Sequence, residues 1–411
     1  MRLLIVTQLF YPDTIGGSER VVYEHARALG GRGHEVTVVV QRARLELPEA
    51  EMIDGVRVFR YGSVNFRRWF GASLTDLFAG RRTLARLLNE EIFDAAILHH
   101  PFPAWAYFRA RGRKIIPTLY FFHASVYREL VYERGRGRPI SRSVLGVLAE
   151  RLFAPLLLAR VRWVERKVLR NSSRIAVLSD FSRRIISETF RAPENLIIKI
   201  PGGVDLETYR PHPNPRALRM RLNLPTDRAV ILSVRRLVPR VGLEELLAAA
   251  EELLRRAPSL QLVVGGSGPE RNRLVALARR LGISRSVTFL GTVAPRDLPD
   301  YYAAADLFVM PSVAFEGFGL ATLEALAAST PVVGTPVGAI PEILNQLDRE
   351  LVAVDATPAA LAAAIQNFLD RPPVEREELR RRARELAESE YPWSRSVDLL
   401  ENELTKLVRG D

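Results

Sequence analysis

Short apolar runs rich in β-branched residues alternate with helical patterns along the whole chain. Strands that alternate with helices form parallel sheets covered on both faces, so the pattern predicts the doubly wound α/β class. The alternation of strands and helices is interrupted at two proline-containing turns, residues 201–203 and 211–213, and then resumes. The expected strands before and after this interruption are residues 3–7, 36–40, 56–61, 95–98, 115–122, 175–178 and 196–200, and then 229–234, 260–264, 287–290, 307–310, 332–334 and 351–354.

Two such runs predict two Rossmann-like domains that face a central cleft. The length of 411 residues agrees with this, because domains commonly hold about 100 to 200 residues. We expect an N-terminal domain over residues 1–203 and a C-terminal domain over residues 204–392. A last helical pattern, about 393–411, lies beyond the second domain and is expected to pack back on the first.

The chain contains no cysteine, which excludes thiolate metal sites and thiol catalysis. Its charge is unevenly placed. Residues 1–200 hold 33 Lys or Arg and 19 Asp or Glu, a net charge of +14, whereas residues 201–411 have a net charge of −2. The excess predicts an anionic partner for the first half. Nucleic acid, an anionic membrane surface and a phosphorylated substrate all remain open on charge alone.

No run of about 18 apolar residues is present, so no membrane-spanning helix is expected, and the run 3–7 is too short for a signal peptide. A cytoplasmic location is therefore the default expectation. Residues 65–70 combine aromatic and basic side chains, as segments at a membrane surface do. Further positive charge follows at Arg109, Arg111, Arg113, Lys114 and the loop 134–142. Solvated arginines on helices and loops are the alternative interpretation.

Residues 315–326, with the sequence FEGFGLATLEAL, form the strongest motif. They follow the expected strand 307–310, so their glycines lie in a loop that opens a helix, where free backbone N–H groups suit a phosphate or sugar hydroxyls. Glu316 in the loop and Glu324 in the helix have no basic partner nearby in sequence, which suggests that they bind hydroxyl groups. The alternative is a glycine-rich turn with surface glutamates.

A second motif, residues 233–244, ends the first strand of the second domain and leads into a helix. Ligands bind at the carboxyl ends of strands in open α/β sheets. Arg236 and Arg240 are therefore placed to clamp a diphosphate and to stabilise it as a leaving group. A pair of solvated arginines is the alternative.

Glycines follow two further strands. Gly16 and Gly17 come after the strand 3–7, and Gly268 comes after the strand 260–264, at positions where a ligand can approach the backbone closely. Neither segment forms the G-x-G-x-x-G fingerprint, so dinucleotide binding is weakly supported.

His123 ends an apolar run and is expected at the edge of the cleft, where it can hydrogen-bond a substrate hydroxyl or a neighbouring base. A histidine after a strand is more often structural, and that interpretation stays open. His99 and His100 end another strand without a third ligand at metal spacing, and no Asp-x-Asp pair is present. We therefore expect no metal ion and no cofactor.

Taken together, these segments resemble glycosyltransferase family 4, a large family of retaining enzymes with the GT-B fold. The resemblance covers nearly the whole chain in the right order, through YPDTIGGSE, RGHEVTVV, LSDFSRR, PGGVDLETY, RRLVPRVGLEELL, GGSGPE, FEGFGLATLEAL and TPVVGTPVGAIPE. It implies that a sugar nucleotide binds mainly to the second domain and an acceptor to the first.

The resemblance also implies roles for single residues. Glu316 would contact the donor sugar, Glu324 the ribose hydroxyls and Arg236 the diphosphate. His123 would lie beside the reacting sugar, and His123, Glu316 and Arg236 form the expected catalytic group. The remaining implied donor contacts are Gly16, Gly17, Arg240, Gly268, Val293, Phe318, Gly319, Leu320 and Ala321. One position departs from the family, because its usual lysine is Val241 here, and Arg240 is the expected substitute.

The implied reaction moves a hexosyl unit from a UDP-, GDP- or ADP-sugar, the co-substrate, to an acceptor, a lipid-linked or cell-envelope glycan, with retention at the anomeric carbon. The implied location is the cytoplasm, at the inner face of the membrane. A noncatalytic sugar-nucleotide-binding scaffold or sensor with the same fold is the alternative. Nucleic-acid binding is disfavoured, because the basic residues lack a recognisable reading module.

Overall fold

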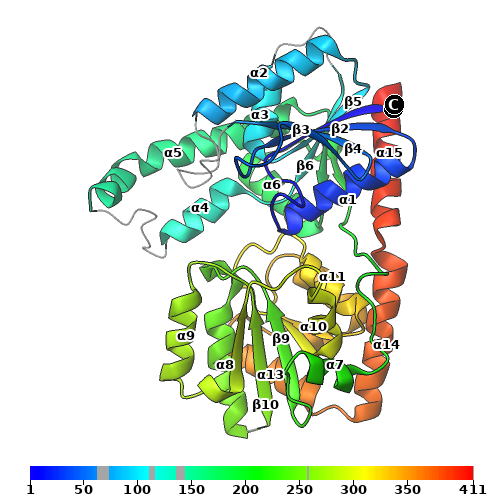
Figure 1. Ribbon diagram of the computed structural model, residues 1–411. Coiled ribbons are helices and arrows are strands. Elements are labelled where there is room, and N and C mark those ends of the chain that lie inside the picture. The colour runs from blue at the N-terminus through cyan, green and yellow to red at the C-terminus, as the bar shows by residue number, and fades with distance from the viewer. Residues whose placement is uncertain (63–73, 111–115, 136–143, 257–258, 411) are drawn as a thin grey trace. The chain divides into compact units, whose positions relative to one another are not determined.

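The computed structural model describes residues 1–62, 74–110, 116–135, 144–256 and 259–410 (Figure 1). The chain divides into two compact units, here called unit 1 (Met1–Pro201 and Trp393–Asp411) and unit 2 (Gly202–Pro392). The division lies two residues from the boundary expected at residue 203, and the last helix belongs to unit 1. Several predicted basic positions lie outside the described residues: 65–70, Arg111, Arg113, Lys114 and most of the loop 134–142.

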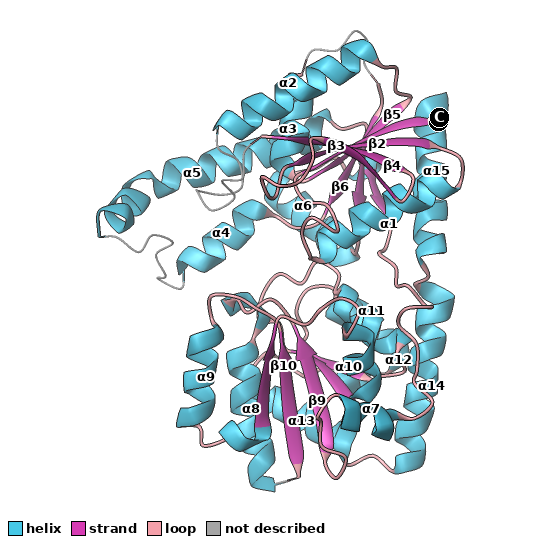
Figure 2. Cartoon of the chain, in the orientation of Figure 1, coloured by secondary structure: helices cyan, strands magenta, loops and turns pink. Residues whose placement is uncertain are grey.

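Unit 1 contains an eight-stranded sheet in the order β3-β4-β2-β1-β5-β6-β7-β8 (Figure 2). Its neighbouring strands are parallel except β3 and β4, which are antiparallel. The strands are β1 Arg2–Thr7, β2 Glu35–Gln41, β3 Ala50–Ile53, β4 Val56–Tyr61, β5 Ala95–His99, β6 Thr118–Phe122, β7 Arg174–Val177 and β8 Ile197–Lys199. The sequence pattern misses β3, because this short edge strand is nowhere buried and so lacks an apolar signature.

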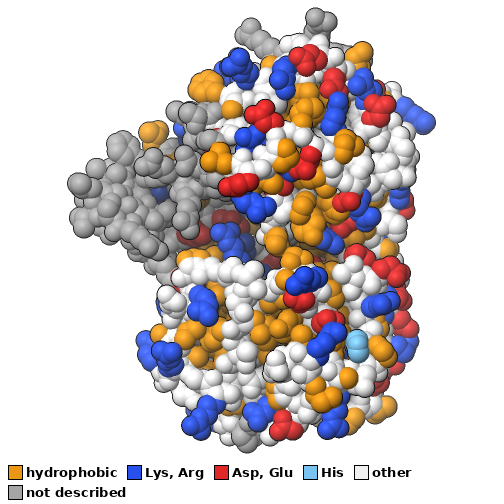
Figure 3. Space-filling model, in the orientation of Figure 1, with side chains coloured by type: hydrophobic (Ala, Val, Ile, Leu, Met, Phe, Trp, Pro, Cys, Tyr) orange, Lys and Arg blue, Asp and Glu red, His pale blue; other side chains and the backbone are white. Residues whose placement is uncertain are grey.

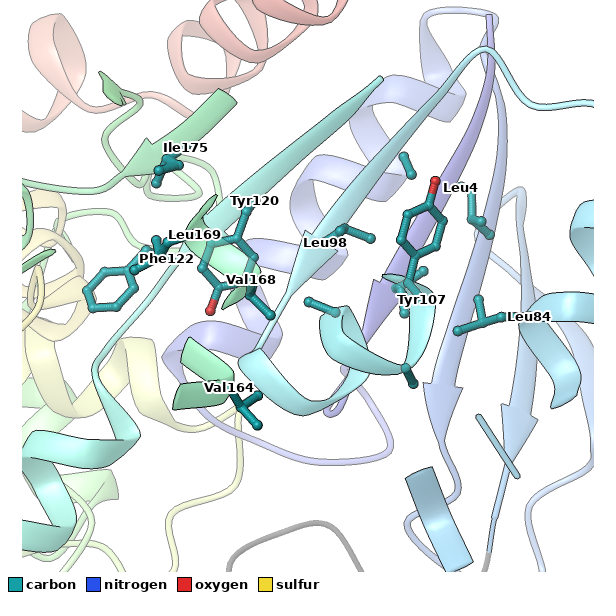
Figure 4. Close-up of a cluster of buried hydrophobic side chains, with 14 of the residues drawn as sticks. Leu4, Leu84, Leu98, Tyr107, Tyr120, Phe122, Val164, Val168, Leu169 and Ile175 are labelled. Atoms are coloured by element: carbon teal, nitrogen blue, oxygen red, sulfur yellow. The ribbon is translucent and has the colours of Figure 1, made fainter. Parts of the chain in front are cut away.

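Helices of unit 1 pack a continuous apolar core on the sheet. The helices are α1 Gly17–Gly31, α2 Leu74–Glu90, α3 Pro101–Arg109, α4 Val126–Gly135, α5 Val144–Asn171, α6 Asp180–Phe190 and α15 Trp393–Arg409. Alternate residues of a strand face opposite sides of the sheet, so Leu4 and Val6 of β1 join the core beneath α2, α3 and α5. Figure 4 shows Tyr107 of α3 and Val168 of α5 among the side chains of this core.

The last helix, α15, packs on α1, as the sequence leads us to expect. Buried Ser396 accepts a hydrogen bond from His25 Nε2 at 2.9 Å and donates to the carbonyl of Pro201 at 2.6 Å. Glu401 also binds Arg32 and His34, each at 2.7 Å. Buried apolar side chains, hydrogen bonds and ion pairs thus hold α15 against the rest of unit 1.

Unit 2 contains a five-stranded parallel sheet in the order β11-β10-β9-β12-β13. Its strands are β9 Ala229–Val234, β10 Leu260–Gly265, β11 Val287–Gly291, β12 Leu307–Met310 and β13 Val332–Gly334. Its helices are α7 Pro215–Arg221, α8 Leu243–Arg256, α9 Arg271–Arg280, α10 Leu298–Ala304, α11 Leu320–Ala327, α12 Ile340–Leu347, α13 Pro358–Leu369 and α14 Pro373–Glu390. The doubly wound prediction is confirmed in both units.

One strand prediction in unit 2 is wrong. Residues 351–354 do not form a strand: a short 3-10 helix, Arg349–Leu351, leads to a single parallel bridge between Val352 and Gly334. The apolar run is short, and its burial comes from packing beside β13 rather than from a full ladder.

No helix in the described ranges is long and apolar enough to cross a membrane. The longest, α5, is repeatedly interrupted by cations.

Candidate functional site

The carboxyl ends of the unit 2 strands carry three loops that are bonded to one another. The loop after β9 meets the loop after β10 where Leu237 N–H donates to the carbonyl of Ser267 at 2.9 Å. It meets the loop after β12 where Val313 N–H donates to the carbonyl of Arg240 at 2.9 Å. A Cβ atom at Gly268 would lie 2.3 Å from the carbonyl oxygen of Leu237, so this glycine is needed for close contact. The three loops after β9, β10 and β12, here called the loop layer, therefore hold the predicted motifs of unit 2.

Glu316 lies in the loop after β12, with its side chain 12% exposed. Arg235, from the end of β9, donates to Glu316 Oε2, and Ser312 Oγ donates to the same oxygen at 2.9 Å. Burial alone raises the pKa of Glu316, but the charges of Arg235 and Arg240 and these hydrogen bonds outweigh it and hold the pKa below its ordinary value. The sequence offers Glu316 no nearby basic partner, but the fold supplies one 81 residues away. The interpretation of a carboxylate free for hydroxyl groups is thus corrected to an ion-paired carboxylate.

The two predicted arginines differ in their surroundings. Arg236 is exposed and forms no ion pair or side-chain hydrogen bond with the residues that the structure describes. Arg240 is half-buried, and its charge acts on Glu316. Val241 is 2% exposed and belongs to the core, so the family lysine is replaced by an apolar core residue. Arg236 and Arg240 are thus two cations in the loop that follows β9.

Helix α11 begins at this edge with Gly319 as its N-cap, at φ +92°, and without a side-chain cap. Its first backbone N–H groups, on Leu320 and Ala321, have no partner within the helix. Phe318, before the cap, is buried, as is Gly319 itself. The N-terminus of α11 is thus a place where an anion or hydroxyl is favoured.

Glu324, in the second turn of α11, is held by a residue that the sequence does not single out. Tyr302 of α10, 1% exposed, donates its hydroxyl to Glu324 Oε2 at 2.8 Å. Burial first, and then Glu324, raises the pKa of Tyr302 well above its ordinary value, so the hydroxyl remains a donor.

Val293, beyond β11, packs at the end of β10, where a Cβ at Gly265 would lie 3.0 Å from its methyl group.

In unit 1, the glycine loop before α1 is anchored by a buried ion pair. Arg60 donates to Asp13 through two nitrogens, at 2.6 and 2.9 Å, and the Arg60 side chain is 0% exposed. Gly16, the N-cap of α1, and Gly17 are exposed. Glu19 folds back over Gly16, because a Cβ there would lie 2.5 Å from Glu19 Oε2. The loop is therefore fixed while its glycine backbone stays open to solvent.

His123 follows β6 and pairs with His99 at the end of β5, with 2.8 Å between His123 Nε2 and His99 Nδ1. Burial first, and then neighbouring histidines, hold the pKa of both rings well below the ordinary value, so both are neutral. One of the two must then donate a single N–H. The outer nitrogens of the pair, His99 Nε2 and His123 Nδ1, are both buried and have no partner among the described residues.

The turn after His123 is clamped by Glu165 of α5. Glu165 accepts hydrogen bonds from Val126 N–H at 2.9 Å, from Tyr127 N–H at 3.1 Å and from Ser125 Oγ at 3.3 Å. The carboxyl group of Glu165 therefore caps the N-terminus of α4. Burial raises the pKa of Glu165 to about 8. Sequence reasoning misses Glu165, because nothing in its neighbourhood marks it as a cap for a helix that ends well before it.

Two family models cover most of the chain. Residues 15–208 match Glycosyltransferase Family 4, and residues 216–388 match Glycosyl transferases group 1. A D-inositol 3-phosphate glycosyltransferase from Kineococcus radiotolerans is 31% identical over 386 residues, which span 87% of this chain and 83% of that relative. The chain belongs to glycosyltransferase family 4.

Further relatives agree with this family 4 glycosyltransferase assignment. A GDP-mannose-dependent alpha-(1-6)-phosphatidylinositol monomannoside mannosyltransferase from Mycobacterium tuberculosis is 31% identical over 265 residues, 62% of this chain and 66% of that relative. Sucrose-phosphate synthase from Thermosynechococcus elongatus shares the fold, with a TM-score of 0.81 at 22% identity and all of both chains covered. The expected GT-B fold is confirmed. The assignment as an enzyme, a glycosyltransferase, agrees with the family model and with the named relatives.

Proposed function

We propose that this glycosyltransferase moves a hexosyl unit from a nucleoside diphosphate sugar to a lipid-linked or cell-envelope acceptor, with retention at the anomeric carbon. The observation that supports this most directly is the loop layer of unit 2. It combines an exposed guanidinium, Arg236, and the uncapped N-terminus of α11 with two fixed carboxylates, Glu316 and Glu324. Cations and helix N-termini suit phosphates, and carboxylates suit sugar hydroxyls, so the layer matches both parts of a sugar nucleotide.

In the proposed reaction, the bond between the anomeric carbon and the diphosphate oxygen breaks, the acceptor oxygen bonds to that carbon on the same face, and the proton of the acceptor hydroxyl passes to the departing diphosphate. Negative charge grows on the departing diphosphate. Arg236, Arg240 and the first N–H groups of α11 stabilise that charge. Glu324, oriented by Tyr302, accepts hydrogen bonds from the ribose hydroxyls. Glu316 contacts the donor sugar through Oε1, because Arg235 and Ser312 both donate to Oε2.

The proposal also assigns roles in unit 1. His123 hydrogen-bonds a sugar hydroxyl, and the backbone at Gly16 and Gly17 approaches the diphosphate. His123 acts by positioning rather than by proton transfer, since its lowered pKa keeps the ring neutral. No metal ion or cofactor takes part in the proposed reaction.

The lipid-linked acceptor is supported by two observations. The name of the relative from Mycobacterium tuberculosis includes phosphatidylinositol monomannoside, a glycolipid, and GDP-mannose. The first 200 residues also carry a net charge of +14, which favours an acceptor with phosphate groups or one embedded in an anionic membrane surface. We place the enzyme in the cytoplasm, at the inner face of the membrane.

The test combines two variants with a matched control. Arg236→Ala and Glu324→Ala are each expected to lower kcat/KM by at least about tenfold, a loss of roughly 1.4 kcal/mol of transition-state stabilisation. Arg279→Ala, which removes an exposed arginine from the end of α9, is expected to leave kcat/KM unchanged. Unchanged turnover in both test variants would refute the site assignment.

The donor is identified by thermal shift with UDP, GDP and ADP, followed by assays with their sugars. The anomeric configuration of the product, read by NMR, tests retention. An inverted product would refute the proposed stereochemistry while leaving the donor site intact.

A further inference from the structure

One side of helix α5 carries positive charge with no exposed acidic residue between residues 154 and 171. Exposed side chains recur at spacings of four and three residues, which places them in one stripe along the helix. The stripe consists of Leu156, Arg160, Trp163, Lys167 and Arg170. Arg162 and Arg166 are also exposed and widen it on one flank. We call these seven side chains the basic face; Glu165, the acidic residue of this segment, is buried as the cap of α4.

The cations of the basic face are unpaired: none of the five forms an ion pair with the residues that the structure describes. Some exposed arginines on other helices of the same chain are paired with glutamates of their own helix. On α14, Arg381 pairs with Glu378 and Glu385, and on α8, Arg255 pairs with Glu251 at 3.0 Å. Figure 3 shows basic and acidic side chains intermixed along the edge where α14 lies. The basic face therefore differs from α8 and α14, where glutamates of the same helix pair with the exposed arginines.

Apolar groups within the basic face are also exposed. Leu156 is 70% exposed and Trp163 is 47% exposed. Trp163 packs edge-on against Trp105 of α3, with ring centroids 4.9 Å apart. Cations flank this pair, since Lys167 Nζ lies 5.9 Å from the Trp163 ring and the Arg109 guanidinium carbon 5.9 Å from the Trp105 ring. Tryptophans flanked by cations are typical of the boundary between lipid headgroups and acyl chains.

A polar pocket of about 370 Å³ opens beside the basic face, between α5 and α6. Arg162, Arg166 and Arg191 line it, with Glu188 as its acidic residue. Its excess of guanidinium groups extends the positive surface to α6 and suits a phosphate group.

We propose that the basic face of α5 binds an anionic phospholipid surface. Trp163 and Leu156 insert at the headgroup boundary, and the cations contact lipid phosphates. A nucleic acid would satisfy the cations but would leave the exposed leucine without an apolar partner. The inference extends the proposed function, because it brings the enzyme to a lipid-linked acceptor. Binding itself requires no glycosyl transfer, so the two proposals fail separately.

The experiment is cosedimentation of the full chain with vesicles of phosphatidylcholine, with and without phosphatidylglycerol. The wild type is expected to bind only the anionic vesicles and to dissociate as salt rises. A cation near an anionic surface contributes about fivefold in affinity, so the triple variant Arg160→Gln/Lys167→Gln/Arg170→Gln is expected to bind roughly a hundredfold more weakly. Trp163→Ala is expected to weaken binding by a factor that salt does not change.

The control variant Arg255→Gln/Arg256→Gln/Arg381→Gln removes the same charge from helices where glutamates match it. It is expected to bind the vesicles as the wild type does. If the control variant loses as much affinity for the anionic vesicles as the triple variant, net charge alone explains the effect, and the inference is overturned. Equal binding to neutral vesicles, or displacement from vesicles by free glycerol 3-phosphate, would also overturn it. The same holds if the wild type binds a short DNA duplex more tightly than the vesicles and the triple variant loses that DNA binding. Transfer to a water-soluble acceptor should survive in the triple variant.

Discussion

The ion pair between Arg235 and Glu316 offers a quantitative test of how unit 2 is assembled. Both side chains are nearly buried, at 9% and 12% exposure. Removing one partner of such a pair leaves the other charge uncompensated, which costs about 3 to 5 kcal/mol. Arg235→Met retains most of the side-chain volume and removes the charge together with the hydrogen bonds that the guanidinium donates. In a unit of this size, the unfolding midpoint should therefore fall by roughly 6 to 20 °C at neutral pH.

The pH dependence of this loss has a definite sign. In the wild type, the pKa of Glu316 is lowered on folding, so the carboxylate stabilises the fold above its unfolded pKa and loses that effect as the pH falls. In Arg235→Met, the carboxylate loses the charge and the hydrogen bond of Arg235, and only Arg240 and Ser312 still oppose the effect of burial, so the pKa of Glu316 rises relative to the wild type. The difference between wild type and variant should thus be largest at neutral pH and should shrink as the pH approaches about 4.

Calorimetric unfolding measures the loss, and amide exchange of β9 and β12 assigns it to unit 2. The double variant Arg235→Met/Glu316→Gln should recover most of the stability, because no buried charge remains. Arg255→Met breaks an exposed pair and should cost at most about 1 kcal/mol. Equal losses for Arg235→Met and Arg255→Met, or no recovery in the double variant, would refute the reasoning.

Three further predictions concern unit 1 and the loop layer of unit 2. Urea unfolding should show that unit 1 loses stability as the pH falls below 6.5, by at most about 1.4 kcal/mol per pH unit. The reason is that buried His25 has a lowered pKa of about 3 and takes up a proton only on unfolding. As the pH rises from 4.5 to 8, unit 1 should also lose stability, because the raised pKa of Glu165 keeps a proton on the folded protein that the unfolded chain releases. Glu165→Gln should abolish this loss, and an unchanged dependence of stability on pH would contradict the prediction. In thermal unfolding, Gly282→Ala should cost about 1 to 2 kcal/mol for its positive φ alone. Gly242→Ala should cost clearly more, because its Cβ would lie 1.7 Å from the carbonyl oxygen of Pro311, and equal losses would contradict the packed loop layer.

The neighbouring arginines at the end of β9 show where sequence reasoning stops. The motif predicts that Arg236 and Arg240 face a ligand, and Arg236 is indeed exposed at the carboxyl edge. It gives no reason to single out Arg235, although this residue holds Glu316. The partner lies on the loop after β12, and β12 becomes a neighbour of β9 only through the strand order of the sheet.

The same limit applies to Tyr302, His99 and Glu165. Each orients a candidate site residue or the turn beside it from another element, at separations of 22 to 40 residues. Hydrogen-bond geometry between such residues depends on packing, and periodicity does not encode it.

The sequence by itself determined the alternation of strands and helices, the two α/β runs and the glycine loops at strand ends. These are local properties, because hydrophobic period and the backbone freedom of glycine act within a few residues. Tertiary structure alone decided which charges are buried, which two histidines hydrogen-bond to each other and which side of α5 is left unpaired. Those outcomes depend on which elements become neighbours, since burial and pairing arise between residues that are far apart in the chain.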